Sequence, residues 1–302
     1  MPIPFTLRQL EYFVAVAEQG SVTAAAACRN VSQPSVSVAI SDLEAMLGRV
    51  LFRRQAGHTL SITPAGRRLL VQARTALAAA SQISATGQDS LAAGELSICC
   101  FRDLGSIYLP RLLTAFAKLH PGLNYRLSEG DLADVRAKVL DGRCEVAITY
   151  DIDLHKHGVV RSTIDRLLPH ALLATHHPLA KGNRVALTDL TGERIVLEDF
   201  PVTNDYFIGL FKRHGLEALS IQMAPSFEMQ RGLVANGWGV GLSCVRPKPD
   251  FSYDGSPLVC LPLSSAEPMQ EVVIAHLGEA ALSHAARHFL GVARQSDRSR
   301  PR

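Results

Sequence analysis

Several features that define other protein classes are missing from this chain of 302 residues. No apolar run approaches the roughly 20 residues that a membrane-spanning helix needs, so we expect no contact with a membrane. No signal peptide precedes the first expected helix, which predicts a cytoplasmic protein. The six cysteines follow no metal-ligand spacing and lie mostly among apolar residues. Reduced, buried thiols are therefore expected in place of disulfides or a metal site.

Sequence signatures of catalysis are also missing. The chain has no nucleophile elbow, no histidine pair at metal-ligand spacing and no phosphate-cradling loop. The glycines around Trp238 lack the spacing of a dinucleotide-binding loop and are better explained by a tight turn between a helix and a strand. We therefore expect a protein that is not an enzyme and that carries no cofactor and no resident metal.

Two short segments leave an alternative open. The stretch DIDLHKH at 151–157 alternates aspartate and histidine, which could bind a divalent metal, although a solvated loop explains it as well. Cys99 and Cys100 are neighbours at the end of an expected strand, so their side chains point to opposite faces. A disulfide between them would be strained, which disfavours a peroxide-sensing role.

Lysine is absent from residues 1–90, which hold eight arginines against five acidic residues. Residues 91–302 balance at 23 basic and 23 acidic residues, so the whole surplus of positive charge lies in the N-terminal segment. Such a surplus is typical of a segment that contacts phosphate. Because the surplus is small, we expect non-specific binding to DNA to be modest and sensitive to salt.

Residues 21–47 have the pattern of two short helices joined by a tight turn. Ser21 and Ser32 are suited to cap the two helices, and Pro34 lies in the first turn of the second, where its missing N–H costs nothing. One face of the second helix carries apolar residues at steps of four and three: Val36, Ile40, Leu43 and Leu47. The segment is therefore predicted to be a helix-turn-helix, which places its second helix in the DNA major groove.

The opposite face of this second helix is built from short side chains. A solvated helix normally carries lysine and glutamate there, whereas hydroxyls and one valine suit close approach to base edges. The residues expected to face the groove are Ser32, Gln33, Pro34, Ser37, Val38 and Ser41. The stretch LFRRQAGHTLSIT at 51–63 is predicted to be a two-stranded wing with residues 55–58 at its tip. Phosphate contacts are expected from Ser21, Thr23, Arg53 and Arg54.

Thr63 and Pro64 predict the start of a long helix, because a hydroxyl cap precedes a proline at the first helical position. Small or apolar residues follow at positions 69, 73, 76, 80 and 83, flanked by Leu70 and Leu77. This spacing is similar to the seam of a short coiled coil and predicts pairing of two chains. The alternative is a helix that packs on its own domain.

Beyond Gly87 and Gly94, expected strands and helices alternate in a parallel, doubly wound α/β pattern. The expected strands are 96–101, 125–128, 144–150, 167–174, 195–197, 221–224, 240–243 and 271–277. The expected helices are 106–119, 132–140, 204–213, 226–236 and 280–294. The polar, arginine-rich tail from residue 295 is expected to be disordered.

The run from Leu7 to Gly66 carries a specific resemblance. The segments LRQLEYFVAVAEQGSVTAAA, VSQPSVSVAISDLEAMLG, LFRR and LSITPAG follow one another almost without interruption, and they resemble the LysR-type transcriptional regulators. One position departs from the pattern: Val38 stands where many members carry a basic residue that meets DNA. A valine can still contact a thymine methyl group.

The resemblance implies a winged helix-turn-helix domain over residues 1–63, a linker helix over 64–90 and an effector-binding domain over 91–302. The last would have two Rossmann-like lobes similar to periplasmic binding proteins. Lobe I would comprise residues 91–160 and 269–302, and lobe II residues 161–268. The implied function is sequence-specific binding of double-stranded DNA under control of a small molecule, by a dimer formed through the linker helix and joined into a tetramer.

In such a fold the ligand belongs between the lobes, at strand C-termini and helix N-termini. The expected contacts are Phe101, Arg102, Asp103, Asp131, Tyr150, Pro201, Thr203, Asn204 and Phe227. We expect an organic acid or a zwitterion, with Arg102 as a bidentate anchor, although Arg102 could instead pair with Asp103.

Three acidic residues leave other possibilities open for this site. Asp103, Glu129 and Asp131 would repel an anion, so an amine-bearing effector is the alternative. Asp131 is also suited to cap the helix that follows it. A C-terminal half that only joins subunits, without a ligand, is a further alternative.

Overall fold

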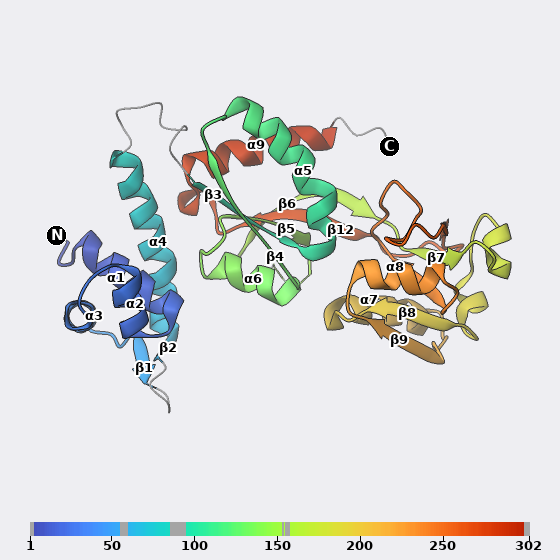
Figure 1. The fold of residues 1–302 in the computed structure, drawn as a ribbon, viewed down its shortest axis with the longest axis horizontal. Coiled ribbons are helices and arrows are strands. Elements are labelled where there is room, and N and C mark those ends of the chain that lie inside the picture. The colour runs from blue at the N-terminus through green and yellow to red at the C-terminus, as the bar shows by residue number, and fades with distance from the viewer. Residues whose placement is uncertain (1–2, 55–59, 85–94, 153, 155–157, 299–302) are drawn as a thin grey trace.

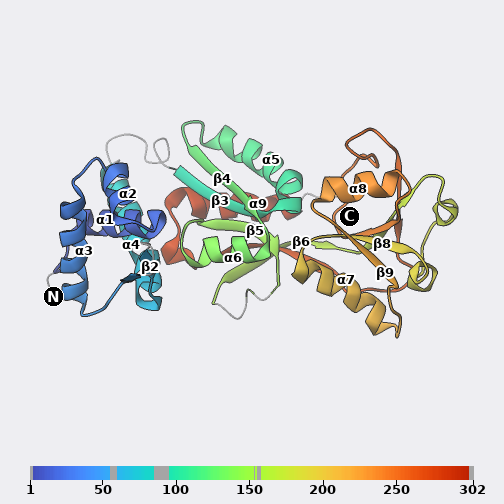
Figure 2. The ribbon, with the colours of Figure 1, turned by 60° about the horizontal axis from the view of Figure 1, so that its bottom comes forward.

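A computed structural model describes residues 3–54, 60–84, 95–152, 154 and 158–298. The N-terminal domain and its long helix lie at one end, lobe I lies in the centre, and lobe II lies at the other end (Figures 1 and 2). Within the described ranges, no helix has the length and apolar character needed to cross a membrane.

The N-terminal domain is a helical bundle with a small hairpin. Its elements are α1 (Leu7–Gln19), α2 (Val22–Cys28), α3 (Gln33–Leu47), β1 (Phe52–Arg54), β2 (Leu60–Ile62) and α4 (Pro64–Ser84). Hydroxyl side chains begin the first three helices, since Thr6, Ser21 and Ser32 each accept a hydrogen bond from a backbone N–H in the following turn. The caps expected at Ser21 and Ser32 are therefore confirmed.

Helix α4 packs on the domain from which it emerges. Gly66 sits so close to the preceding loop that a Cβ atom there would lie 2.4 Å from the Leu51 carbonyl oxygen. Leu70 and Ala73 are buried in the core of the N-terminal domain. Ala73 had been expected on an intermolecular seam, whereas the structure buries it within its own chain and leaves Ala76 exposed.

Lobe I is a five-stranded sheet covered on both faces. Its elements are β3 (Glu95–Phe101), α5 (Arg102–Leu119), β4 (Asn124–Gly130), α6 (Leu132–Leu140), β5 (Val146–Tyr150), β6 (Val160–Leu167), β12 (Gln270–His276), the short 3-10 helix η4 (Glu279–Ala281) and α9 (His284–Arg298). The strand order is β4-β3-β5-β12-β6, with β12 antiparallel to both of its neighbours. Helices α5 and α9 cover one face and α6 covers the other (Figure 1).

Lobe II repeats this layered arrangement. Its elements are β7 (His170–Ala174), the 3-10 helices η2 (Pro178–Lys181) and η3 (Leu187–Leu190), β8 (Arg194–Glu198), α7 (Pro201–Arg213), β9 (Ser220–Ala224), α8 (Phe227–Ala235), β10 (Val240–Ser243) and β11 (Leu258–Pro262). The strand order is β11-β7-β10-β8-β9, and β7 is antiparallel to β10 and β11. Helices α7 and α8 pack on opposite faces (Figure 2).

The sheets correct the expectation of a purely parallel pattern, because both are mixed. The expected strand 167–174 is two strands separated at Leu168 and Pro169, since β6 pairs in lobe I and β7 pairs in lobe II. Lobe I therefore extends to Leu167, beyond the expected boundary near residue 160. The sequence did not reveal β6 because this edge strand is mostly polar and exposed.

Two helix boundaries also differ from expectation. Helix α5 begins at Arg102, directly after β3, so residues 102–105 form its first turn and are not a loop. Gly105 hid this turn from the sequence pattern, yet it permits close packing, because a Cβ there would lie 2.7 Å from both Cys100 Sγ and Glu129 Oε1. Helix α9 continues to Arg298, past the expected start of a disordered tail.

Candidate functional site

Helix α3 presents the surface that was expected to meet DNA. Its inner face is buried through Val36, Ile40 and Leu43. The Val38 side chain on the other face is 60% exposed. Of the remaining expected groove residues, Ser37 is half-buried, whereas Ser32, Gln33, Pro34 and Ser41 are exposed. An exposed apolar side chain among small polar ones suits close approach to base edges in a DNA groove.

A shallow groove runs between α1 and α3, beside Val38. Its walls include Arg8 and Tyr12 from α1 and Pro34 from α3. The Arg8 side chain is exposed, and its Nε donates a hydrogen bond to the Tyr12 hydroxyl over 3.0 Å. Arg8 therefore places a cation next to the expected recognition face. The sequence analysis overlooked this residue, although it is the one basic residue of α1.

The expected phosphate-contacting residues surround the same face. Ser21 caps α2 by accepting a hydrogen bond from the Ala24 N–H over 3.4 Å, and Thr23 is exposed in the first turn. Arg53 is exposed on β1, opposite Ser61 of β2. The side chain of Arg54 and residues 55–59, which include the expected wing tip at 55–58, lie outside the described residues.

A small pocket lies between the two lobes, lined by residues of both. Four of the expected contact residues line it: Asp103, Tyr150, Thr203 and Asn204. Lobe II adds Tyr206, from the segment 201–206 that was expected to reach the cleft, together with Glu198 and Cys244, which the sequence did not indicate. Glu198 ends the buried strand β8, so its position at a strand C-terminus was the available signal.

The other expected contact residues lie around the pocket without lining it. The Phe101 ring packs against Tyr150 and Phe200, with ring centroids 5.4 Å and 5.3 Å away. Arg102 is exposed, and its guanidinium lies 5.3 Å from the centre of the Phe200 ring. Phe227 is buried in the apolar cluster of lobe I. Aromatic packing therefore joins the lobes beside the pocket, and Arg102 stacks on its rim.

Asp131 and Pro201 lie at helix N-termini and not in the pocket wall. The Asp131 carboxylate accepts a hydrogen bond from the Asp134 N–H over 2.8 Å, so the capping role considered for this residue is confirmed. Pro201 is exposed at the first turn of α7.

Two carboxyl groups from opposite lobes meet in the pocket. Asp103 comes from the first turn of α5 and Glu198 from the end of β8, and both side chains line the same pocket. Each residue is only 8% exposed. Burial raises the pKa of Asp103 to about 6, and burial together with repulsion from Asp103 raises the pKa of Glu198 to about 10. Near neutral pH the pair therefore holds one proton and one negative charge.

The pocket wall also contains polar atoms that lack a partner among the described residues. They are Asp103 Oδ1, Glu198 Oε2, Thr203 Oγ1 and Asn204 Oδ1. A buried oxygen without a hydrogen bond is costly, so such atoms mark places where water or a ligand group binds. All four can accept hydrogen bonds, and they come from both lobes.

The thiols are free, and five of the six are buried as expected, while Cys28 is exposed on α2. Burial raises the pKa of Cys244 in the pocket wall to about 12, and the pKa of Cys100 likewise to about 12. A thiol with such a raised pKa is a poor nucleophile at neutral pH.

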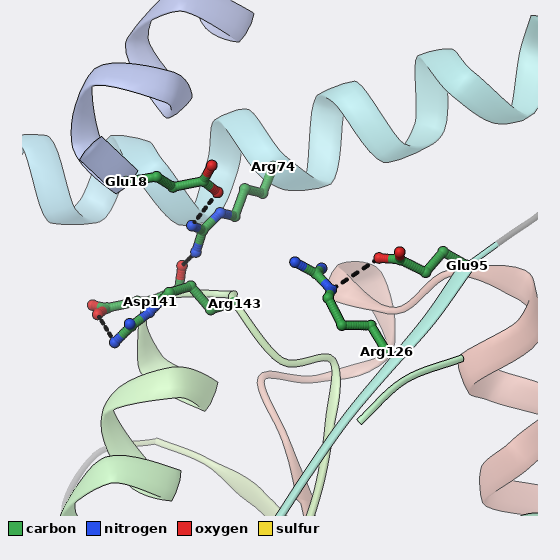
Figure 3. A network of polar contacts seen from close by, with 6 residues as sticks. All are labelled: Glu18, Arg74, Glu95, Arg126, Asp141 and Arg143. Carbon is green, nitrogen blue, oxygen red and sulfur yellow. Dashed lines mark hydrogen bonds and ion pairs between the residues drawn. The ribbon is translucent and has the colours of Figure 1, made fainter. Parts of the chain in front are cut away.

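A polar network connects the N-terminal domain to lobe I (Figure 3). Arg74 of α4 pairs with Glu18 of α1 over 2.8 Å and also donates to the backbone carbonyl of Asp141, which follows α6. The Asp141 carboxylate in turn pairs with Arg143 over 3.2 Å. Arg74 therefore contacts both the helical domain and the effector domain of the same chain.

Comparisons with known proteins agree with this architecture. The family model described as "Bacterial regulatory helix-turn-helix protein, lysR family" matches residues 7–67, and the model described as "LysR substrate binding domain" matches residues 89–298. A hydrogen peroxide-inducible genes activator of Pectobacterium carotovorum subsp. carotovorum is 30% identical over 275 residues, which is 89% of each chain.

Solved structures show the same relationship. HinK, a LysR family transcriptional regulator from Pseudomonas aeruginosa, has 33% identity and a TM-score of 0.63, over 96% of this chain and 98% of that one. Full-length CbnR in complex with its target DNA has 25% identity and a TM-score of 0.56, over 97% of this chain and all (100%) of that one. This chain, with its helix-turn-helix and its two-lobed effector-binding domain, belongs to the LysR family of transcriptional regulators.

Proposed function

We propose that this regulator changes its affinity for a DNA operator when a small molecule binds in the pocket between lobes I and II. The observation that carries the proposal is the set of unpartnered oxygens in the pocket, contributed by Asp103 on one lobe and by Glu198 and Asn204 on the other. A ligand that hydrogen-bonds both sides favours the closed arrangement by its differential affinity for that arrangement.

On the DNA side, the proposal places α3 in the major groove. The exposed Val38 side chain contacts a thymine methyl group, and Ser37 and Ser41 contact base edges. Ser32, Gln33 and Pro34 approach the groove at the N-terminus of α3. The phosphate contacts come from Ser21, Thr23, Arg53, Arg54 and the additional Arg8. Because operator DNA lies in the cytoplasm, we place the protein there.

The working unit is proposed to be a dimer joined through α4, with effector domains pairing dimers into a tetramer. Two readers double the number of base contacts and require a two-fold related operator. Since α4 buries Leu70 and Ala73 within its own domain, the dimer seam uses the side of α4 that carries the exposed Ala76.

Two experiments on the full-length chain test these assignments separately. Footprinting on the DNA that flanks the protein's own gene is expected to protect a two-fold related site. Thermal unfolding with a panel of organic acids, amines and amino acids is expected to show stabilisation by one class. Protection without stabilisation by any compound would support the alternative in which the C-terminal half only joins subunits.

A further inference from the structure

The geometry points to a cationic ligand: we infer that the pocket between the lobes takes an organic ammonium group, alone or in a zwitterion, which binds Asp103 on one lobe and Glu198 on the other. This inference rests on the proposed function and names its ligand class. It reverses the expectation from the sequence, in which Arg102 anchored an acid.

The position of the two carboxyl groups is the first support. Asp103 belongs to lobe I and Glu198 to lobe II, and both buried carboxyl groups line the same pocket, each with one oxygen that has no hydrogen-bond partner among the described residues. An ammonium group supplies a positive charge and three N–H donors. When it enters, the proton that the pair holds near neutral pH leaves to solvent, and the ammonium bridges two carboxylates across the lobes.

The remaining polar atoms of the pocket wall suit a ligand group that donates hydrogen bonds and not one that accepts them. Asn204 is only 6% exposed, its Oδ1 has no described partner, and its Nδ2 lies 3.4 Å from Met223 Sδ. The Tyr206 hydroxyl donates its proton to the Pro268 carbonyl over 2.6 Å, so it is not available as a donor to an acidic ligand. The pocket therefore offers acceptors to the third N–H of an ammonium group.

The charges around the pair are also predominantly negative. Glu228 of α8 and Glu129 of β4 both act on Asp103 and raise its pKa, whereas Arg102 lowers it. Arg102 is exposed and stacks on Phe200 outside the pocket wall. The four acidic side chains Asp103, Glu198, Glu228 and Glu129 thus outnumber the single cation Arg102, and an anionic ligand would be disfavoured there.

The wall favours an organic cation over a metal ion. Tyr150, Tyr206 and Phe207 supply aromatic surface next to the carboxyl pair, and aromatic faces attract ammonium groups. Across the described part of the chain, no three side chains of His, Cys, Asp or Glu converge as metal ligands. In the described part of the chain, a divalent cation would find no third carboxylate, thiolate or imidazole beside Asp103 and Glu198.

The test is calorimetry and thermal unfolding of the full-length protein with benzylamine, putrescine, ethanolamine and glycine. Each is compared with an analogue in which an uncharged amide or alcohol replaces the amine. Benzoate and succinate represent the acids. We expect stabilisation by at least one amine and by none of the acids. Titration in phosphate and in Tris near pH 7.5 is expected to show release of a proton on binding.

Three variants separate the inference from its alternatives. Glu198→Gln and Asp103→Asn keep the shape of the side chain but remove its charge, so each is expected to weaken amine binding about tenfold or more. Glu217→Gln makes the same change on the exposed surface of lobe II and is expected to bind like the parent. Operator binding reports that each variant is folded.

The pH profile adds a readout that a purely structural role would not give. Amine affinity is expected to fall below about pH 6, where Asp103 gains a proton. The Tyr150 hydroxyl and Cys244 thiol, which also face the pair, stay neutral over this range because burial raises the pKa of each. The other charged side chains that act on Asp103 are Glu228, Glu129 and Arg102.

The outcomes distinguish this inference from the proposed function. Stabilisation by an acid that is lost in Arg102→Ala would overturn the cationic site and keep the effector pocket. Amine binding that is unchanged in Glu198→Gln would overturn the assignment of the pair. Failure of every amine and acid to stabilise the protein would count against both the inference and the effector pocket, with the DNA assignment still judged by footprinting.

Discussion

Arg74 and Glu18 form an ion pair of 2.8 Å that ties the long helix α4 to the end of α1, while the same guanidinium reaches across to lobe I (Figure 3). Burial lowers the pKa of Arg74, but guanidinium groups stay protonated in proteins. A permanent charge thus lies where the DNA-binding domain meets the effector domain.

Replacing Arg74 by alanine is expected to lower the free energy of unfolding by about 1–3 kcal/mol, because its partners lose a charged donor that is largely shielded from solvent. The matched control is Arg126→Ala, which removes an exposed pair with Glu95 and should cost less than about 1 kcal/mol. Chemical denaturation measures both. Equal effects for the two variants would contradict a special role for Arg74.

The Glu198 pair predicts an unusual dependence of stability on pH. The folded protein binds the Glu198 proton more tightly than the unfolded chain, since the pKa rises from 4.5 to about 10. This contribution is complete below pH 4.5 and is lost as the pH rises toward 10, so burying the carboxyl group destabilises the protein across the neutral range.

At pH 8 the melting temperature of Glu198→Gln is therefore expected to lie above that of the parent, by about 2–4 °C for each kcal/mol of stability recovered. At pH 4 the two proteins are expected to melt at the same temperature. Differential scanning calorimetry across this range measures the effect. A variant that melts lower at pH 8 would show that the carboxylate is compensated in the folded state.

Substitutions on α3 and on the wing should weaken DNA binding in different ways. Arg53→Ala removes a phosphate contact, so it should weaken binding to all sequences and reduce the salt slope by about one unit. Val38→Ala should instead change the preference between bases, by roughly 1–3 kcal/mol at one position. Fluorescence anisotropy with operator and scrambled DNA at several salt concentrations separates these effects.

The dimer seam is tested by charge. Ala76→Glu places like charges across the proposed α4 interface and is expected to reduce the mass measured by light scattering. The control is Ala76→Ser, which is small and uncharged and should leave the mass unchanged. A glutamate variant of unaltered mass would place the dimer contact elsewhere.

The buried thiols predict that this protein responds only weakly to peroxide. Several relatives, in contrast, are named as hydrogen peroxide-inducible genes activators. Burial raises the pKa of Cys100 and Cys244 to about 12, so neither is a reactive thiolate at neutral pH. We expect iodoacetamide to label the exposed Cys28 far faster than the buried thiols, as followed by peptide mass spectrometry. If hydrogen peroxide formed a disulfide in this protein as fast as it caused release of DNA, the prediction of weak sensitivity would be wrong.

Local patterns in the sequence were sufficient for much of the fold. The caps at Ser21 and Ser32 and the buried face through Ile40 depend on residues close together in the chain, so they could be predicted. The strand β6 could not, because its pairing with β12 joins segments about 100 residues apart and its exposed face carries no apolar signal.

The effector site was only partly predictable for the same reason. Asp103 and Asn204 were found because they follow strands and begin helices. Their meeting with Glu198 depends on how the lobes close, which no local pattern encodes. Arg102 was given the leading role because cations attract acids, but the turn of α5 directs its neighbour Asp103 into the pocket instead.

The chain leaves lobe I and returns to it at neighbouring positions, so lobe II can be removed from the chain as one piece. Leu167, where the chain leaves lobe I, is the register partner of Gln270, where it returns. The whole of lobe II is thus inserted at the tip of what would otherwise be a simple β-hairpin. Because insertions at such tips leave the parent sheet intact, a short turn joining residues 167 and 270 should yield lobe I as an independent folding unit that keeps its strand order while losing most of the pocket wall.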